Sequence, residues 1–197
     1  MRRRFVELFG ILTLAFAGPL ASLLQAQTPD TSLFRSRQWG VDFNIGSGFA
    51  GAGLIHFRSP TRALVLDFGG SVQTSTSGTT VTTSGNIVQA NVSLGARRYH
   101  PFAPRVYSYR TLGIEGNYSH SFIGGATDLT VNGWSGGLFG ELGAGWLVTP
   151  HLALGAAWRL SADYGWSEAR QAGVQQGKTH GLSVALGQVR LTGQLYF

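Results

Sequence analysis

The sequence predicts an all-β fold of eight antiparallel strands that run up and down in sequence order. Three observations indicate it. Eight consecutive segments alternate apolar and polar residues, which is the period of a strand, because successive side chains of a strand point to opposite faces. No segment of comparable length has helical periodicity. The connections alternate between short turns that contain Pro and longer polar stretches.

The alternating segments follow one another from residue 39 to the C-terminus. The seventh has the cleanest pattern, since Leu154, Trp158 and Leu160 alternate with Ala157 and Arg159. The segments cover residues 39–45, 53–58, 64–72, 88–97, 106–118, 134–148, 152–166 and 182–197.

Two segments change face along their length. In the fifth, Tyr107 and Tyr109 fall on the otherwise polar face, and Arg110 falls on the apolar face. In the eighth, Leu182 has the opposite parity from the apolar residues after Gly187. Because one extra residue reverses the faces of a strand, we expect β-bulges near Arg110 and near Gly187.

The composition indicates that the apolar face meets lipid. Charged residues make up only 12% of the chain, about half the usual share, and Lys178 is its only lysine. A water-facing surface needs more charge than this. A secreted barrel of the lipocalin type, with the apolar face inside, is the alternative that periodicity alone leaves open. The chain has no Cys, which excludes disulfides and cysteine-based metal sites.

The first 26 residues resemble a secretory signal peptide. Arg2, Arg3 and Arg4 precede a mostly apolar run over 9–24, and Ala26 offers a small residue for cleavage. An uncleaved anchor is the alternative reading. The predicted domains are therefore a signal peptide (1–26), a linker on the exported side (27–37) and a barrel (38–197).

The connections predict how the barrel is oriented. Short turns near residues 60, 102 and 150 fall on one side, with both termini. The Gly-rich turn 46–51 and the polar loops 74–85, 120–132 and 167–179 fall on the other side. Short inner turns and longer outer loops are typical of membrane barrels.

A sheet in hydrocarbon must close on itself, and eight strands close around an interior that side chains can fill. Aromatic residues of the apolar face are expected near the membrane interfaces or on the wall: Trp39, Trp146, Trp158, Tyr164, Trp166 and Phe197. The polar face is expected to form a lumen in which charges of both signs pair: Asp42, His56, Arg58, Asp67, Arg97, Glu115, Glu141, Arg159, Asp163 and Arg190.

The last strand is amphipathic and ends on Phe197. It resembles the C-terminal signal that the assembly machinery of bacterial outer-membrane barrels reads. With the leader, the strand number and the loop alternation, the chain resembles the small eight-stranded outer-membrane barrels, such as the transmembrane domain of the OmpA family and the OmpX type. This resemblance implies a location in the outer membrane, with its lipids and the barrel assembly machinery as partners.

The function expected first is that of a non-enzymatic barrel that serves envelope integrity or surface interaction through its outer loops. A lipid A acyl hydrolase or transferase is an alternative, with His120 beside Ser119 or Ser121, or His180 with Ser183, as candidate groups. A narrow pore is another.

The five histidines show no ligand-like spacing, so no metal site and no cofactor are predicted. No basic run occurs outside the leader, which argues against nucleic-acid binding. The sequence does not identify an extracellular partner.

Overall fold

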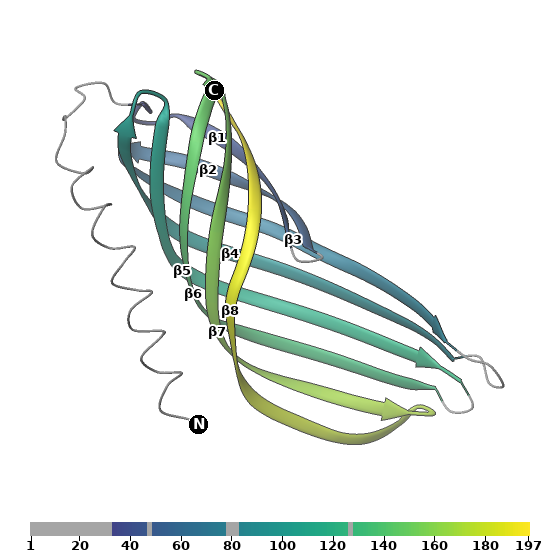
Figure 1. Cartoon of the computed structure of the whole chain (residues 1–197). Helices are drawn as coiled ribbons and strands as arrows, with labels where there is room; N and C mark the ends of the chain where they lie inside the picture. Colours follow the sequence, from purple (N-terminus) through teal and green to yellow (C-terminus); the bar gives the residue numbers. More distant parts are fainter. Residues whose placement is uncertain (1–32, 47–48, 78–82, 126–127) are drawn as a thin grey trace, which may run out of the picture.

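The computed structural model describes residues 33–46, 49–77, 83–125 and 128–197, and these form a closed barrel of eight antiparallel strands (Figure 1). Every strand pairs with its neighbours in sequence, and β8 pairs with β1. The predicted fold class is therefore confirmed. The strands are β1 (Trp39–Gly46), β2 (Phe49–Ser59), β3 (Arg62–Ser77), β4 (Thr83–Ala103), β5 (Val106–Gly124), β6 (Leu129–Thr149), β7 (Leu152–Gln171) and β8 (Val174–Tyr196).

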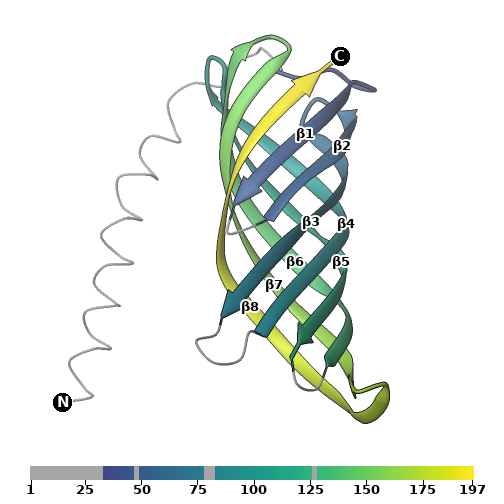
Figure 2. The same cartoon turned by 90° about the vertical axis from the view of Figure 1, so that its right-hand side faces the viewer.

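The predicted signal peptide and the first part of the predicted linker lie outside the described residues. Across the described part of the chain, no helix has the length and apolar character needed to cross a membrane. Both ends of the described chain lie at the same end of the barrel as the β2–β3, β4–β5 and β6–β7 turns (Figure 2). We call this the terminal end, and we call the opposite end, with the β3–β4, β5–β6 and β7–β8 hairpins, the hairpin end.

Most of the polar stretches predicted as outer loops are strand. The ladders extend to Ser77↔Thr83, Ile123↔Leu129 and Gln171↔Val174. The loop prediction rested on composition, because Ser and Gly are common in loops. In the structure, backbone pairing with the neighbouring strands continues through these residues and keeps them extended. The hairpins therefore extend the barrel wall.

The strands β1 and β2 are much shorter than the others, with 8 and 11 residues against 16 to 23. The β1–β8 ladder runs from Gly40↔Tyr196 to Ile45↔Leu191 only. Similarly, β2 pairs with β3 only as far as Ala50↔Gly70. Among the described residues, the hairpin-end parts of β3 and β8 therefore pair on one side only, and the wall is cut back between them (Figure 2).

One of the two expected bulges is present. Arg159 pairs with Gln188 and Ser161 with Ala185, so Leu186 and Gly187 together face one residue of β7. Gly187 has φ +84, a conformation that favours glycine in a bulge. The bulge near Gly187 is confirmed.

The bulge expected near Arg110 is wrong, because pairing of β5 with β4 and β6 is continuous through this residue. Tyr107 and Tyr109 are buried inside the barrel, and Arg110 is exposed on its outer face. The change of face in the sequence marks a change in what fills the interior, from polar groups to aromatic rings.

Outward-facing side chains are mostly apolar. Leu112, Leu138 and Leu191 are each more than half exposed, although each has a buried inward neighbour on its strand: Thr111, Phe139 and Arg190. An apolar outer wall of this kind is suited to hydrocarbon rather than to water.

Candidate functional site: a filled terminal half and an outer cavity

The interior of the terminal end is filled by an aromatic layer made of Phe34, Phe57, Tyr99, Tyr107 and Tyr196. Phe34 belongs to the segment before β1 and is only 2% exposed. Its ring lies 4.6 to 5.2 Å from the centroids of the other four rings. The segment is held at the rim because the Arg37 amide donates to the Phe57 carbonyl at 2.7 Å.

Glycines of β6 make room for inward tyrosines. A Cβ atom at Gly143 would lie 2.2 Å from the Tyr109 ring, and one at Gly145 would lie 2.5 Å from the Tyr107 ring. These distances are far below van der Waals contact. The Gly-x-Gly spacing in the sixth strand therefore allows large rings on β5 to lie across the backbone of its neighbour.

Gln194 joins the aromatic layer to a charged layer on its hairpin side, made of Asp42, Arg97 and Glu141. The Tyr107 hydroxyl donates to Gln194 Oε1 at 2.7 Å, and the Tyr196 hydroxyl donates to the same oxygen. Gln194 Nε2 in turn donates to Asp42 Oδ2 at 3.2 Å. The two layers thus form one hydrogen-bonded unit across β1, β5 and β8.

Arg97 lies at the centre of the charged layer and is 2% exposed. Its Nη2 is 2.9 Å from Glu141 Oε1, and its Nη1 is 3.5 Å from Asp42 Oδ2. Nε donates to Thr111 Oγ1 at 2.9 Å, and the guanidinium lies 4.2 Å from the centre of the Tyr109 ring. Arg97 therefore connects strands from different sides of the barrel across its axis.

A second ion pair lies nearer the hairpin end. Arg159 pairs with Glu115, and its guanidinium lies 3.6 Å from the centre of the Phe139 ring. Asp163 accepts hydrogen bonds from Ser161 at 3.2 Å and from Asn117 at 3.4 Å. These polar groups occupy the interior on the hairpin side of Arg97.

The remaining inward charges have fewer partners. Asp67 and Arg190 are both buried. Within the described part of the chain, Asp67 Oδ1 has no hydrogen-bond partner. The Arg190 guanidinium lies 5.4 Å from the centre of the Phe49 ring.

Two residues predicted for the lumen lie elsewhere, so their assignment is wrong. His56 and Arg58 point outward; Arg58 is exposed, and the His56 ring lies 4.3 Å from the outward ring of Trp39. Ile55 and Phe57 point inward instead and are fully buried. In β2, therefore, apolar side chains such as Phe57 face inward and pack in the aromatic layer, instead of facing outward as the lumen prediction assumed. The other predicted lumen residues point inward: Asp42, Asp67, Arg97, Glu115, Glu141, Arg159, Asp163 and Arg190.

The aromatic layer was not predicted from the sequence. The opposite parity of Tyr107 and Tyr109 was the available signal for it. No pattern pointed to Phe34, because it lies in a polar stretch before the first strand.

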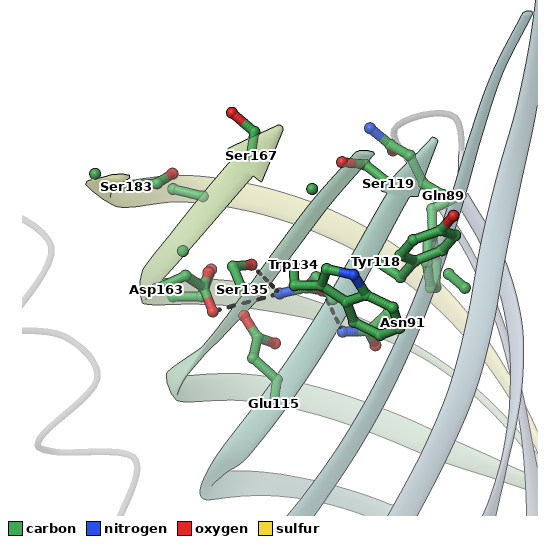
Figure 3. A pocket seen from close by; sticks show the side chains of 18 of the residues that line it. Gln89, Asn91, Glu115, Tyr118, Ser119, Trp134, Ser135, Asp163, Ser167 and Ser183 are labelled. Atoms are coloured by element: carbon green, nitrogen blue, oxygen red, sulfur yellow. Dashed lines mark hydrogen bonds between the residues drawn. The ribbon is translucent and has the colours of Figure 1, made fainter. Parts of the chain in front are cut away.

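An outer cavity of about 640 Å³ lies on the hairpin side of the charged layer. Figure 3 shows its polar lining, in which Asn91 Nδ2 donates to Asn117 Oδ1 at 2.6 Å and Asn117 donates to Ser135 at 3.3 Å. Gln89 and Arg190 also line it. Its lining therefore combines amide and hydroxyl groups with the carboxylates of Glu115 and Asp163, and it also includes apolar side chains such as Phe49, Trp134 and Trp166.

The serine and histidine pairs do not form a nucleophile and base. In each pair the two side chains lie on opposite faces of one strand: Ser119 and Ser121 with Asn117 inward, and His120 outward. His120 Nδ1 is hydrogen-bonded to Asn132 at 2.7 Å. His180 and Ser183 are likewise separated in parity, and no Ser–His hydrogen bond joins either pair in the described residues. Nor do any three His, Asp or Glu side chains of these residues converge as a metal site would require.

Solved structures of bacterial outer-membrane proteins have a similar fold. No protein-family model matches the chain, and no curated protein matches it in sequence. A major outer membrane protein from Thermus thermophilus is similar in structure, with a TM-score of 0.59 and 12% identity over 81% of this chain and 98% of that one. OprG from Pseudomonas aeruginosa is similar with a TM-score of 0.54 and 14% identity over 85% of this chain and 99% of that one. The chain therefore has the fold of the small eight-stranded β-barrels of bacterial outer membranes.

Proposed function

We propose that the protein is a non-enzymatic barrel of the bacterial outer membrane that does not conduct ions and acts at the cell surface. The observation that carries this proposal is the filled terminal half. Arg97 bridges Asp42 and Glu141 across the barrel axis. The aromatic layer around Phe34 fills the interior next to it, on the side of the terminal end. An ion that crossed the barrel would have to displace a buried ion-pair network, which is costly.

The apolar outer wall supports the membrane location, since it would meet lipid around the barrel. The amphipathic β8, with the exposed Phe197 after it, supports recognition by the barrel assembly machinery. We propose that the terminal end faces the periplasm and the hairpin end faces the outside of the cell, since short inner turns and longer outer connections are typical of membrane barrels.

The hairpin end supports a role in surface interaction. The long hairpins carry Ser, Thr, Gln and Gly, and the outer cavity offers amides and hydroxyls. Groups of this kind form hydrogen bonds that fix the orientation of a polar partner. We therefore propose a polar, hydrogen-bonding partner at the cell surface.

Planar-bilayer recording tests the filled interior. The wild-type protein is expected to give no steady conductance. A variant with Phe34→Ala and Arg97→Ala should conduct, because it removes one ring and the central cation together. Steady single-channel conductance from the wild type would contradict the proposal.

Single-cysteine labelling tests the orientation, and the chain suits it because it contains no Cys. Gln175→Cys places a thiol at the start of β8, beside the β7–β8 turn, and Thr149→Cys places one at the end of β6, beside the β6–β7 turn. A membrane-impermeant maleimide should label the first on intact cells and the second only after the outer membrane is permeabilised. The reverse pattern would overturn the orientation.

A further inference from the structure

Three arginines lie side by side on the outer face near the terminal end. Arg62 of β3 is directly opposite Arg98 of β4, and Arg98 is directly opposite Arg110 of β5. All three point outward and are exposed. Directly opposed residues on one face have Cβ atoms about 5 Å apart, so this arginine row places three positive charges within roughly 10 Å.

Like charges that are directly opposed in a sheet destabilise it unless a counter-charge is present. None is supplied by the described part of the chain. Five of its carboxylates, at positions 42, 67, 115, 141 and 163, point into the lumen, and Asp128 and Glu168 lie at the hairpin end. Its four ion pairs include no member of the arginine row.

The surroundings of the arginine row indicate an anion at a lipid surface. Toward the hairpin end, the next outward residues on the three strands are Leu64, Ala96 and Leu112, which belong to the apolar wall. In the other direction β3 begins at Arg62, whereas β4 continues through His100 and Phe102 before the turn that leads to Val106, the first residue of β5. The row thus lies near the terminal edge of the apolar wall, of which Phe102 and Trp146 form the last exposed apolar residues on β4 and β6. We place this edge at the depth that lipid headgroups occupy around a membrane barrel.

The other arginines of the terminal end are Arg58, on the strand beside Arg62, and Arg35, Arg37 and Arg105 at the rim, whereas the single Lys178 lies near the opposite end. A planar guanidinium donates two parallel hydrogen bonds to phosphate oxygens, which an ammonium group does not. The chemistry therefore fits phosphate better than a diffuse negative surface.

We propose that the arginine row Arg62–Arg98–Arg110 binds the phosphate groups of anionic phospholipids in the membrane leaflet at the terminal end. This inference rests on the membrane location proposed above. The row is wide enough to contact more than one phosphate, so a lipid with two phosphates or two adjacent anionic lipids would neutralise it.

Lipid titration of the purified full-length barrel tests this site. Wild-type protein in a neutral detergent is titrated with phosphatidylglycerol or phosphatidylcholine, and bound lipid is counted by native mass spectrometry. We expect a clear preference for phosphatidylglycerol. Arg98→Gln should weaken its binding about fivefold, since a basic residue near an anionic lipid contributes about that factor. The Arg62→Gln, Arg98→Gln, Arg110→Gln triple variant should weaken it on the order of a hundredfold. Binding of phosphatidylcholine should not change.

Lys178→Gln is the matched control, because it removes one positive charge from an exposed position near the hairpin end. Arg98→Lys keeps the charge and loses the paired hydrogen bonds, so its affinity should lie between wild type and Arg98→Gln. Folding of each variant is checked by its heat-dependent shift in gel mobility, and Arg98→Lys preserves the test if the triple variant does not fold.

Equal binding of both lipids by the wild type, or an equal loss in Lys178→Gln, would overturn the lipid site. A wild-type preference for an acidic peptide over phosphatidylglycerol would overturn it as well. A barrel that inserts into phosphatidylcholine vesicles but shows no lipid preference refutes the arginine row alone, whereas a barrel that does not insert refutes the membrane location.

Discussion

Truncation of Phe34 tests whether the segment before β1 is an integral part of the barrel. The Phe34 ring is buried and has four aromatic neighbours within 5.2 Å. Removing a ring from such a site loses its transfer free energy and leaves a cavity, which costs about 3–5 kcal/mol. We therefore expect Phe34→Ala to lower the free energy of unfolding by about that amount, although Phe34 lies in no strand.

Reversible urea unfolding of the barrel in lipid vesicles, followed by tryptophan fluorescence, measures the effect. Phe34→Leu is the matched control and should lose less than half as much, because most of the apolar volume remains. A loss below about 1 kcal/mol in Phe34→Ala, or equal losses in both variants, would refute the packing described for the aromatic layer.

Two further predictions concern the lumen and the bulge. Arg97→Gln should destabilise the barrel by about 3–5 kcal/mol in the same assay, because Asp42 and Glu141 would be left buried without their cation. Adding Asp42→Asn and Glu141→Gln to this variant should recover much of the loss, and no recovery would contradict the ion-pair network. Gly187→Ala should cost about 1 kcal/mol, because the φ of +84 is unfavourable with a Cβ atom. Gly177→Ala is its control, since its φ is ordinary and a Cβ there would contact nothing within 4 Å; equal effects at both positions would argue against the bulge.

Alternation was a reliable guide where the two faces differ in chemistry. In β1, Trp39 and Phe43 point outward and Asp42 points inward, as expected. In β2 the rule fails, because Leu54 lies on one face and Ile55 and Phe57 on the other, and only the aromatic layer decides which face is inside. Alternation shows that the two faces of a strand differ in polarity, but it does not show whether polar groups or aromatic rings fill the interior of the barrel.

Strand ends were predicted less well than strand number. The stretch after Val72 is rich in Ser and Thr, which occur in loops and in water-exposed strands alike. Where a wall leaves the membrane, both of its faces are free to be polar, so the alternation fades while the backbone ladder continues. The positions of Asp67 and Arg97 were predictable because each falls on the parity opposite to the apolar residues of its strand.

The early end of β1 and β2 has a consequence for how the cylinder holds together. Its seam consists of six residue pairs, Gly40–Ile45 against Leu191–Tyr196, whereas β6 and β7 share a ladder more than three times as long. Amide protons along this short seam should exchange with solvent before those of the neighbouring ladders, and the last six paired residues of the chain decide whether the sheet is a tube or an open ribbon.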